Sequence, residues 1–207
     1  MADDKKWVTI NGAHIPIENG KPQYGGDNKE TKTEQVRHLK SLVTKKPKDD
    51  NGFRAQSNRS NFFEDDSEDL ETVEVDLTAD IQKQFDNATP EERRDIAFKY
   101  IMDNLRGKYP TKDGRIVAIE KVGAKKIKNT LNEVKIRVIP ELDELIKSGQ
   151  FQYLKADQGN KHKNFVGFAY YKVSFRVGDE VYKGMLNIGI RENGDSTLYE
   201  LNQISKH

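Results

Sequence analysis

The chain has 207 residues, of which 34% are hydrophobic and 33% are charged, and its mean hydropathy is -0.88. It contains no cysteine, which excludes a disulfide framework, a thiolate metal site and a cysteine nucleophile. No apolar run approaches the roughly 18 residues of a membrane-spanning helix, and Met1–Lys6 leads into no signal-like apolar segment. We therefore expect a cytoplasmic protein without a membrane partner.

The net charge of +1 conceals an uneven distribution of charge along the chain. From Pro110 onward there are 17 Lys and Arg against 12 Asp and Glu, whereas the part before it has 18 against 22. A mildly basic C-terminal part suits an anionic partner. The stretch from Glu64 to Asp80 has many acidic residues and no basic one. It is either a solvated linker or a mimic of nucleic acid.

The first part of the chain, residues 1–70, predicts a flexible polar segment with one short hairpin. Apolar and polar residues alternate over Trp7–Ile17 across Asn11-Gly12, a dipeptide typical of tight hairpin turns. Because a lone hairpin is marginally stable in water, we expect it to dock on a partner surface. The remainder is rich in Gly, Lys, Asp, Asn and Ser, and we expect it to be largely disordered, with a transient helix over Thr33–Val43.

Residues 71–109 predict a helical connector. A short strand is expected over Val73–Leu77, where apolar residues alternate. The sequence Thr89-Pro90-Glu91-Glu92 then combines a capping box with Pro at the first helical position. An apolar face continues from Ile96 to Leu105, and Gly107 is expected to end this helix.

Residues 110–207 predict an α+β domain, because helical patterns are followed by a series of strand patterns. A strand over Arg115–Ile119 precedes helices over Gly123–Leu131 and Val134–Lys147, the second interrupted at Pro140. Strands are then expected over Phe151–Leu154, Val166–Val177, Val181–Arg191 and Leu198–Ile204. The predicted fold has helices followed by an antiparallel sheet of about four strands, with the helices on its apolar face.

Three segments of this last part carry a resemblance to known families. In chain order they are GRIVAIEKVGAKKIK, VIPELDELIKSG and FAYYKVSFRVGDEVYKGMLNIGIRENGDSTLYEL. Their succession resembles the third large polyvalent protein-associated domain and related phage nucleases of the barnase, EndoU, colicin and RelE group. The opening VTINGAHIPI resembles a segment of phage head-morphogenesis and minor capsid proteins. The resemblance implies a phage or prophage origin and a location in the cytoplasm of a bacterial host or in the virion.

The resemblance implies a phage accessory protein with a nuclease-like domain, either a ribonuclease toxin or a domain that travels with one. Such an enzyme acts on RNA without a metal or other cofactor. A 2′-hydroxyl attacks the adjacent phosphorus, two side chains move the protons, and cations stabilise the developing charge. The alternatives are a binding module without turnover and a virion protein that docks Trp7–Ile17 on a capsid protein.

Candidate phosphate ligands lie on the predicted helix around Gly123. Lys121, Lys125 and Lys128 follow one another at i, i+4 and i+7, so they share a face that either binds nucleic acid or is merely solvated. Lys126 lies beside them, where the family pattern often has a His or Lys after the Gly. The resemblance therefore makes Lys126 a catalytic candidate.

A second candidate group is the loop Lys161-His162-Lys163. Two flanking ammonium groups favour the neutral form of an imidazole, which makes His162 a candidate base and Lys161 and Lys163 candidate phosphate ligands. The alternative is an ordinary exposed loop. The family pattern has a His just before the aromatic pair, whereas this sequence has Val166-Gly167-Phe168 before Ala169-Tyr170-Tyr171. That departure favours a domain that binds without cleaving.

The third candidate group lies across the turn Asn193-Gly194-Asp195. Arg191 precedes the turn, and Thr197, Tyr199 and Glu200 follow it, so a cation, hydroxyl groups and a carboxylate are expected on adjacent strands. Tyr199 could equally be a core residue and Glu200 an edge charge. The predicted catalytic set is therefore His162, Arg191, Glu200 and Lys126, with Thr197 and Tyr199 as further site residues.

Overall fold

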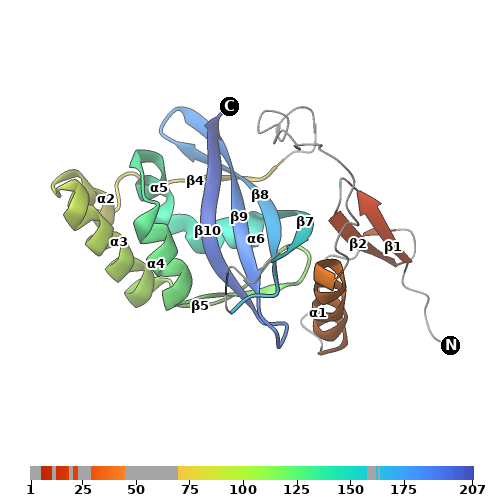
Figure 1. The fold of residues 1–207 in the computed structure, drawn as a ribbon. Coiled ribbons are helices and arrows are strands. Elements are labelled where there is room, and N and C mark those ends of the chain that lie inside the picture. Colours follow the sequence, from red (N-terminus) through yellow and green to blue (C-terminus); the bar gives the residue numbers. More distant parts are fainter. Residues whose placement is uncertain are drawn as a thin grey trace, which may run out of the picture.

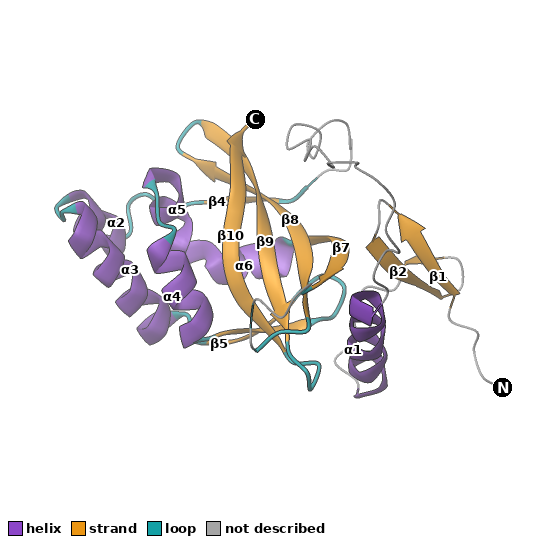
Figure 2. Cartoon of the chain, in the orientation of Figure 1, coloured by secondary structure: helices purple, strands orange, loops and turns teal. Residues whose placement is uncertain are grey.

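The computed structural model describes residues 6–10, 13–18, 21–22, 29–44, 70–157, 162 and 164–207. These residues form helices and a curled seven-stranded sheet, which confirms the α+β class (Figure 1, Figure 2). The strand order is β4-β8-β9-β10-β6-β5, and β7 pairs with the free side of β8 near its start. In Figure 1, α6 lies behind the sheet and α2 to α5 lie beside it.

The strands of this sheet are β4 (Thr72–Glu74), β5 (Gly107–Pro110), β6 (Ile116–Ile119), β7 (Gln150–Ala156), β8 (Gly167–Val177), β9 (Glu180–Ile190) and β10 (Ser196–Lys206). The prediction of about four strands was wrong, because β4, β5 and β6 extend the meander. β4 runs parallel to β8, and β6 runs parallel to β10. β4, β5 and β6 have only three or four residues each. Their membership of the sheet depends on partners far away in the sequence rather than on a long local alternation.

The helices of this part are α2 (Asp80–Asp86), α3 (Pro90–Asn104), α4 (Lys121–Asn129), α5 (Glu133–Val138) and α6 (Leu142–Ser148), with a 3-10 turn, η1 (Ile139–Glu141), between the last two. The predicted capping box begins α3: the Glu92 amide donates to Thr89 Oγ1, and Glu92 Oε2 accepts from the Thr89 amide over 2.8 Å. The predicted interruption at Pro140 is η1. Local sequence therefore determined where these helices begin and break.

The register of β8 and β9 separates two faces of the sheet. Tyr171 pairs with Leu186 and Phe175 with Tyr182 on a face that joins the hydrophobic core, which we call the core face. The alternate residues form the second face, where Phe168 pairs with Gly189, Tyr170 with Asn187 and Lys172 with Met185. The candidate site described below lies on this second face.

The N-terminal part contains β1 (Lys6–Ile10), β2 (Ala13–Glu18) and β3 (Lys21–Pro22), and β1 pairs antiparallel with β2 where the hairpin is predicted. The predicted turn residues Asn11-Gly12 lie outside the described residues. A helix, α1 (Lys29–Thr44), extends beyond the expected Thr33–Val43 and lies beside β7 (Figure 1). Leu39 of α1 is fully buried in the same core as the sheet.

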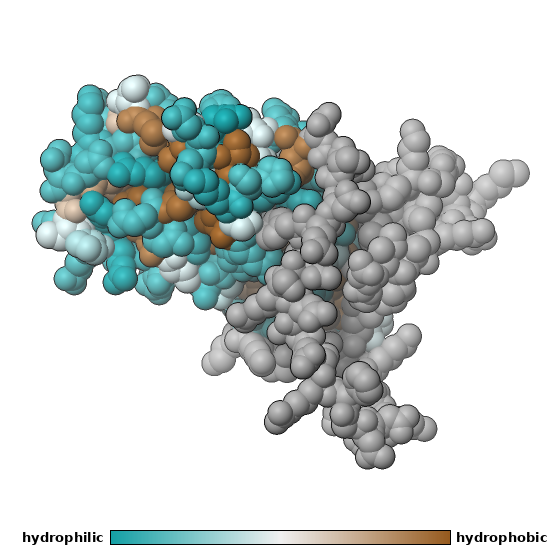
Figure 3. All heavy atoms as spheres, turned by 90° about the horizontal axis from the view of Figure 1, so that it is seen from above, coloured by the Kyte–Doolittle hydropathy of each residue, from teal (hydrophilic) through white to brown (hydrophobic). Residues whose placement is uncertain are grey.

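Hydrophilic residues dominate the visible face of the described part, with smaller hydrophobic areas between them (Figure 3). Leu77 is the single large hydrophobic side chain found exposed among the residues that the structure describes. Within the same residues, no helix has both the length and the apolar character that crossing a membrane requires.

Candidate functional site

The candidate site is built around an irregularity in β10. In a regular strand Leu198 and Leu201, three positions apart, would point to opposite faces. The pairing with β9 shifts between Leu198 and Glu200, and both leucines are buried in the core. Such a β-bulge re-aims the side chains beside it. Here it allows Tyr199 and Glu200 to lie together on the second face, where the Tyr199 ring meets Phe168.

His162 lies in the loop between β7 and β8 and is held by Asp157. The Asp157 side chain, only 5% exposed, accepts a 2.8 Å hydrogen bond from the His162 amide, and its other oxygen lies 3.0 Å from Nδ1. Because an ionised carboxylate accepts hydrogen bonds, it favours the tautomer with a proton on Nδ1, which leaves the lone pair of the neutral ring on Nε2. This dyad fixes an imidazole in one orientation.

Aromatic rings hold His162 beside β10. The imidazole meets the rings of Phe168 and Tyr199 edge-on, with centroids 5.0 Å and 5.4 Å away. Phe165 lies 5.5 Å from the Tyr199 ring and packs over Gly189, where an added Cβ would come within 2.5 Å of the Phe165 ring. The fold therefore brings the His162 ring to Phe168, near the start of the strand that carries Tyr170 and Tyr171.

Helix α4 brings Lys126 to the same place. The helix can approach β10 closely because residue 123 is Gly: an added Cβ there would lie 1.9 Å from the Leu198 carbonyl oxygen. One turn later Lys126 Nζ lies 4.0 Å from Glu200 Oε2 and 5.7 Å from the centre of the Tyr199 ring. Tyr199 therefore contacts both His162 and Lys126.

Two neighbouring side chains respond to the charges of this region. Burial lowers the pKa of Lys135 on α5, while the charge of Glu200 acts to raise it and that of Lys126 to lower it. Burial raises the pKa of Tyr170 on β8, and the charges of Glu200 and Asp157 act in the same direction. Lys135 is only 7% exposed. A second ammonium group is thus kept close to the Glu200 carboxylate.

Asn187 occupies the centre of the second face. In the strand ladders it pairs with Tyr170 on one side and Glu200 on the other. It is 8% exposed, and its Oδ1 has no hydrogen-bond partner among the residues that the structure describes. Buried polar atoms are usually paired, so an unpaired oxygen here is unusual. The Tyr170 ring stacks on Tyr153 with centroids 4.5 Å apart, and burial raises the pKa of Tyr153 to about 12.

We use the name β10 cluster for the side chains of His162, Asp157, Lys126, Tyr199 and Glu200. Three of the predicted site residues, Lys126, Tyr199 and Glu200, are joined by contacts of Lys126, and His162 joins them through Tyr199. The cluster combines an oriented imidazole, a carboxylate and a cation. These groups can transfer two protons and stabilise a developing negative charge.

Arg191 pairs with Glu120 rather than with a member of the β10 cluster, so its convergence with His162 stays a prediction. Arg191 donates to the Glu120 carboxylate, and the Thr197 hydroxyl lies 3.4 Å from the same carboxylate. Thr197 is 1% exposed, so it contacts Glu120 from the interior and does not face a ligand. Glu120 and Arg191 line a pocket of about 640 Å³ at the start of α4. The full lining is Met102, Arg106, Gly107, Lys108, Ala118, Ile119, Glu120, Lys121, Val122 and Arg191.

The lysines predicted to bind phosphate do not share one environment. Lys121 lines the pocket at the start of α4, and Lys125 is exposed on the same helix. Lys128 is paired with Asp95 of α3 and lies over the Phe98 ring. Lys161 and Lys163 lie outside the described residues. The predicted single phosphate-binding face is therefore divided between the pocket and an ion pair with α3.

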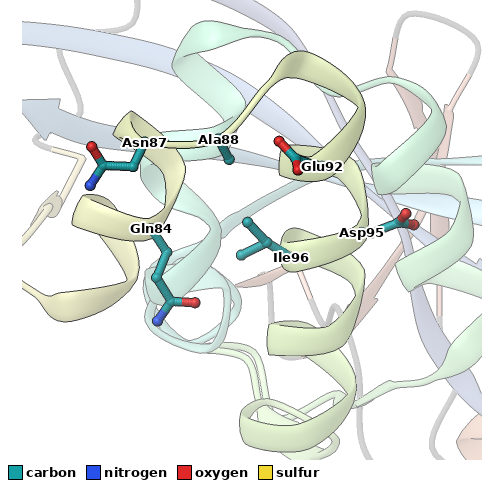
Figure 4. Close-up of a pocket in the computed structure, with 6 residues that line it drawn as sticks. All are labelled: Gln84, Asn87, Ala88, Glu92, Asp95 and Ile96. Carbon is teal, nitrogen blue, oxygen red and sulfur yellow. The ribbon is translucent and has the colours of Figure 1, made fainter.

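A second pocket, of about 450 Å³, lies between α2 and α3 and has a different character (Figure 4). It is lined by Gln84, Asn87, Ala88, Glu92, Asp95 and Ile96. Hydrogen bonds from the Thr89 hydroxyl and amide lower the pKa of Glu92, which belongs to the capping box. Since the lining carries two carboxylates and amide groups, it does not suit a polyanion.

Sequence reasoning missed several members of the site. Asp157 could have been found from its position five residues before His162 in a loop. Lys135 reads as an ordinary helix-surface lysine, and Asn187 as a polar interruption of a strand. Nothing local distinguishes either of them, because burial next to Glu200 arises from packing. No group of three or more His, Asp or Glu side chains in the described ranges is arranged to hold a metal ion.

Comparisons with known proteins give one match. The model of a family described as large polyvalent protein-associated domain 3 matches residues 88–199, which contain all of α3 to α6 and every member of the β10 cluster except Glu200. No curated protein and no solved structure matches the chain. The family match covers more than half of the 207 residues. The chain therefore belongs to the large polyvalent protein-associated domain 3 family.

Proposed function

We propose that the domain binds RNA at the β10 cluster and cleaves it without a metal ion. The observation that carries this proposal is the Asp157–His162 dyad, because a buried carboxylate that orients an imidazole is a typical arrangement for proton transfer. Tyr199 links the imidazole to Lys126, which lies 4.0 Å from Glu200.

The proposed reaction uses the charges in their observed arrangement. Glu200, whose carboxylate lies 4.0 Å from Lys126 Nζ, takes the proton of a ribose 2′-hydroxyl, and the 2′-oxygen attacks the adjacent phosphorus. The bond to the 5′-oxygen breaks, and His162, paired with Asp157, gives that oxygen a proton. Lys126 stabilises the charge on the phosphoryl oxygens. The products are a 2′,3′-cyclic phosphate and a 5′-hydroxyl, so no redox partner is needed.

The second face of the sheet can support the substrate beside this centre. The stacked rings of Tyr153 and Tyr170 lie on the same side as Asn187, and aromatic side chains on a sheet are common platforms for bases.

The activity is tested with the full chain and total tRNA in excess chelator. The parent should produce fragments with 2′,3′-cyclic phosphate ends. Glu200→Gln and His162→Gln should each lower the rate by about 100-fold or more, because each removes one proton-transfer group. Lys99→Gln is the matched control, since Lys99 is an exposed residue of α3 that pairs with Asp103.

Two results would count against this mechanism. Cleavage that is equally fast in the parent, Glu200→Gln and His162→Gln would mean that another site acts. A parent that binds tRNA tightly but leaves it intact at high enzyme concentration would favour the second candidate function, an RNA-binding module without turnover. The stacked pair of Tyr153 and Tyr170 favours that alternative, because such a platform binds bases without any proton transfer.

A further inference from the structure

We propose that the pocket at the start of α4 is a separate subsite for a phosphate group of single-stranded RNA; this rests on the proposed function, because it assigns a second contact of the same ligand. Four cationic side chains line the pocket: Arg106, Lys108, Lys121 and Arg191. Glu120 is the single carboxylate in its lining. With four cationic side chains and one carboxylate, the lining has an excess of three positive charges, which suits an anion.

The cations come from three separate parts of the chain. Arg106 and Lys108 stand at the start of β5, Lys121 begins α4, and Arg191 follows β9. β5 and β6 pair antiparallel, with Lys108 opposite Ala118, so Arg106 and Lys108 are brought to the strand that leads into α4. The first turn of α4 also points unpaired backbone amides toward this end of the helix, which adds to the attraction for an anion.

The size of the pocket favours a sugar-phosphate unit over a small ion. Its volume is about 640 Å³, and Met102, Ile119 and Val122 give it an apolar wall next to the cations. Arg106 and Lys108 are exposed, so a strand can reach them from solvent. An arginine can hold two oxygens of a phosphate at once, which an isolated ammonium cannot do.

Strand β10 connects the surroundings of the pocket with the β10 cluster. The Thr197 hydroxyl lies 3.4 Å from the Glu120 carboxylate, which lines the pocket, and Tyr199 is two residues further along β10. Two residues of a strand span roughly 7 Å, a distance over which adjacent nucleotides of one strand can reach. One RNA strand can therefore have a phosphate in the pocket while the next nucleotides lie at the cluster.

The position of Glu120 predicts the direction in which a change of this residue alters RNA affinity. Its carboxylate is paired with Arg191 in the free protein, so an entering phosphate must compete with it for the guanidinium. Replacing Glu120 by Gln removes the competing charge but keeps the size of the side chain. We expect Glu120→Gln to bind RNA more tightly than the parent, whereas loss of a carboxylate that contacted RNA directly would weaken binding.

The test is equilibrium binding of the full chain to a 2′-O-methyl RNA oligonucleotide, which cannot be cleaved by attack of a 2′-hydroxyl. The double variant Arg106→Ala, Lys108→Ala should weaken binding about tenfold or more and reduce the salt slope by roughly 0.7 for each lost contact. Glu120→Gln should tighten binding severalfold. Lys206→Ala, an exposed lysine at the far end of β10, should change neither quantity.

Three outcomes distinguish the two proposals. If the pocket variants change binding as expected but the parent does not cleave tRNA, the subsite is retained and the catalytic proposal fails. If the parent cleaves tRNA and the pocket variants, shown by thermal unfolding to be folded, bind the oligonucleotide like the parent, the subsite is wrong. Equal binding of a polyglutamate peptide, with the same response to the variants, would also overturn it, because the pocket would then be a general acidic-peptide site.

Discussion

Gly123 is the residue that lets α4 meet the sheet. An added Cβ would lie 1.9 Å from the Leu198 carbonyl oxygen, so α4 and β10 cannot both keep their positions if residue 123 carries a side chain. Since Leu198 is next to Tyr199, a shift of α4 would also move Lys126 away from the Tyr199 ring. The backbone contact is thus the structural basis of the site.

We expect Gly123→Ala to lower the free energy of unfolding by about 2 kcal/mol or more, because the steric conflict outweighs the roughly 1 kcal/mol advantage of Ala over Gly in a helix. Chemical denaturation followed by circular dichroism measures the change. Asn129→Ala, at an exposed position of the same helix, should remain within about 0.5 kcal/mol of the parent. A Gly123→Ala protein more stable than the parent would show that the close contact does not exist.

Lys135 is the residue where function and stability are expected to oppose each other. Burial lowers its pKa below the ordinary value of 10.5, so between the two pKa values the unfolded chain binds more protons than the folded chain. Stability contributed by this group therefore increases as the pH rises through that window. A buried ammonium beside Glu200 is costly for folding but suits a site for a polyanion.

Lys135→Met should raise the free energy of unfolding at pH 7 by about 1 kcal/mol and flatten its increase toward pH 10. RNA affinity should fall in the same variant. Denaturant titrations at both pH values, with Lys125→Met as the exposed control on α4, measure the first effect. Loss of stability at both pH values would mean that Lys135 forms a favourable pair with Glu200.

At the scale of elements, α1 is joined to the sheet by apolar and polar contacts. Leu39 is fully buried, and its side chain lies against Gly167 at the start of β8. Gln35 accepts a hydrogen bond from Arg115 over 3.2 Å, and Arg115 also donates to Tyr171 and Ser196. Lys40 pairs with Glu192, but both side chains are largely exposed. The apolar contact and the buried polar network therefore carry the docking.

Leu39→Ala should release α1 more often than any change of its surface charges. Large-to-small changes in a core cost about 2 to 5 kcal/mol, whereas an exposed ion pair contributes about 1 kcal/mol or less. Amide hydrogen exchange of α1 should accelerate by about 30-fold or more in Leu39→Ala and only slightly in Lys40→Ala, while β9 is unchanged in both. Equal acceleration in the two variants would mean that charge, rather than burial, holds the helix.

At the scale of the whole molecule, one core joins segments that are far apart in the sequence. Val36 and Leu39 of α1, Phe85 of α2 and Ile101 of α3 belong to the same cluster of buried residues as the sheet. β4 pairs with β8 across about a hundred positions, as Thr72 and Ser174 show. The β10 cluster lies on the second face of the strands β8, β9 and β10, opposite the core face. The pocket lies at the start of α4. The core supports both.

The sequence by itself determined the α+β class, the capped start of α3, the break at Pro140 and the long strands β8 and β9. Capping and alternation act between residues a few positions apart, so they can be recognised without knowledge of the fold. Tertiary structure alone decided that β4, β5 and β6 complete the sheet, that the bulge brings Tyr199 and Glu200 to one face, and that Arg191 belongs to the pocket of Glu120. These features depend on register and packing against partners that are distant in the chain, and no local pattern specifies such contacts.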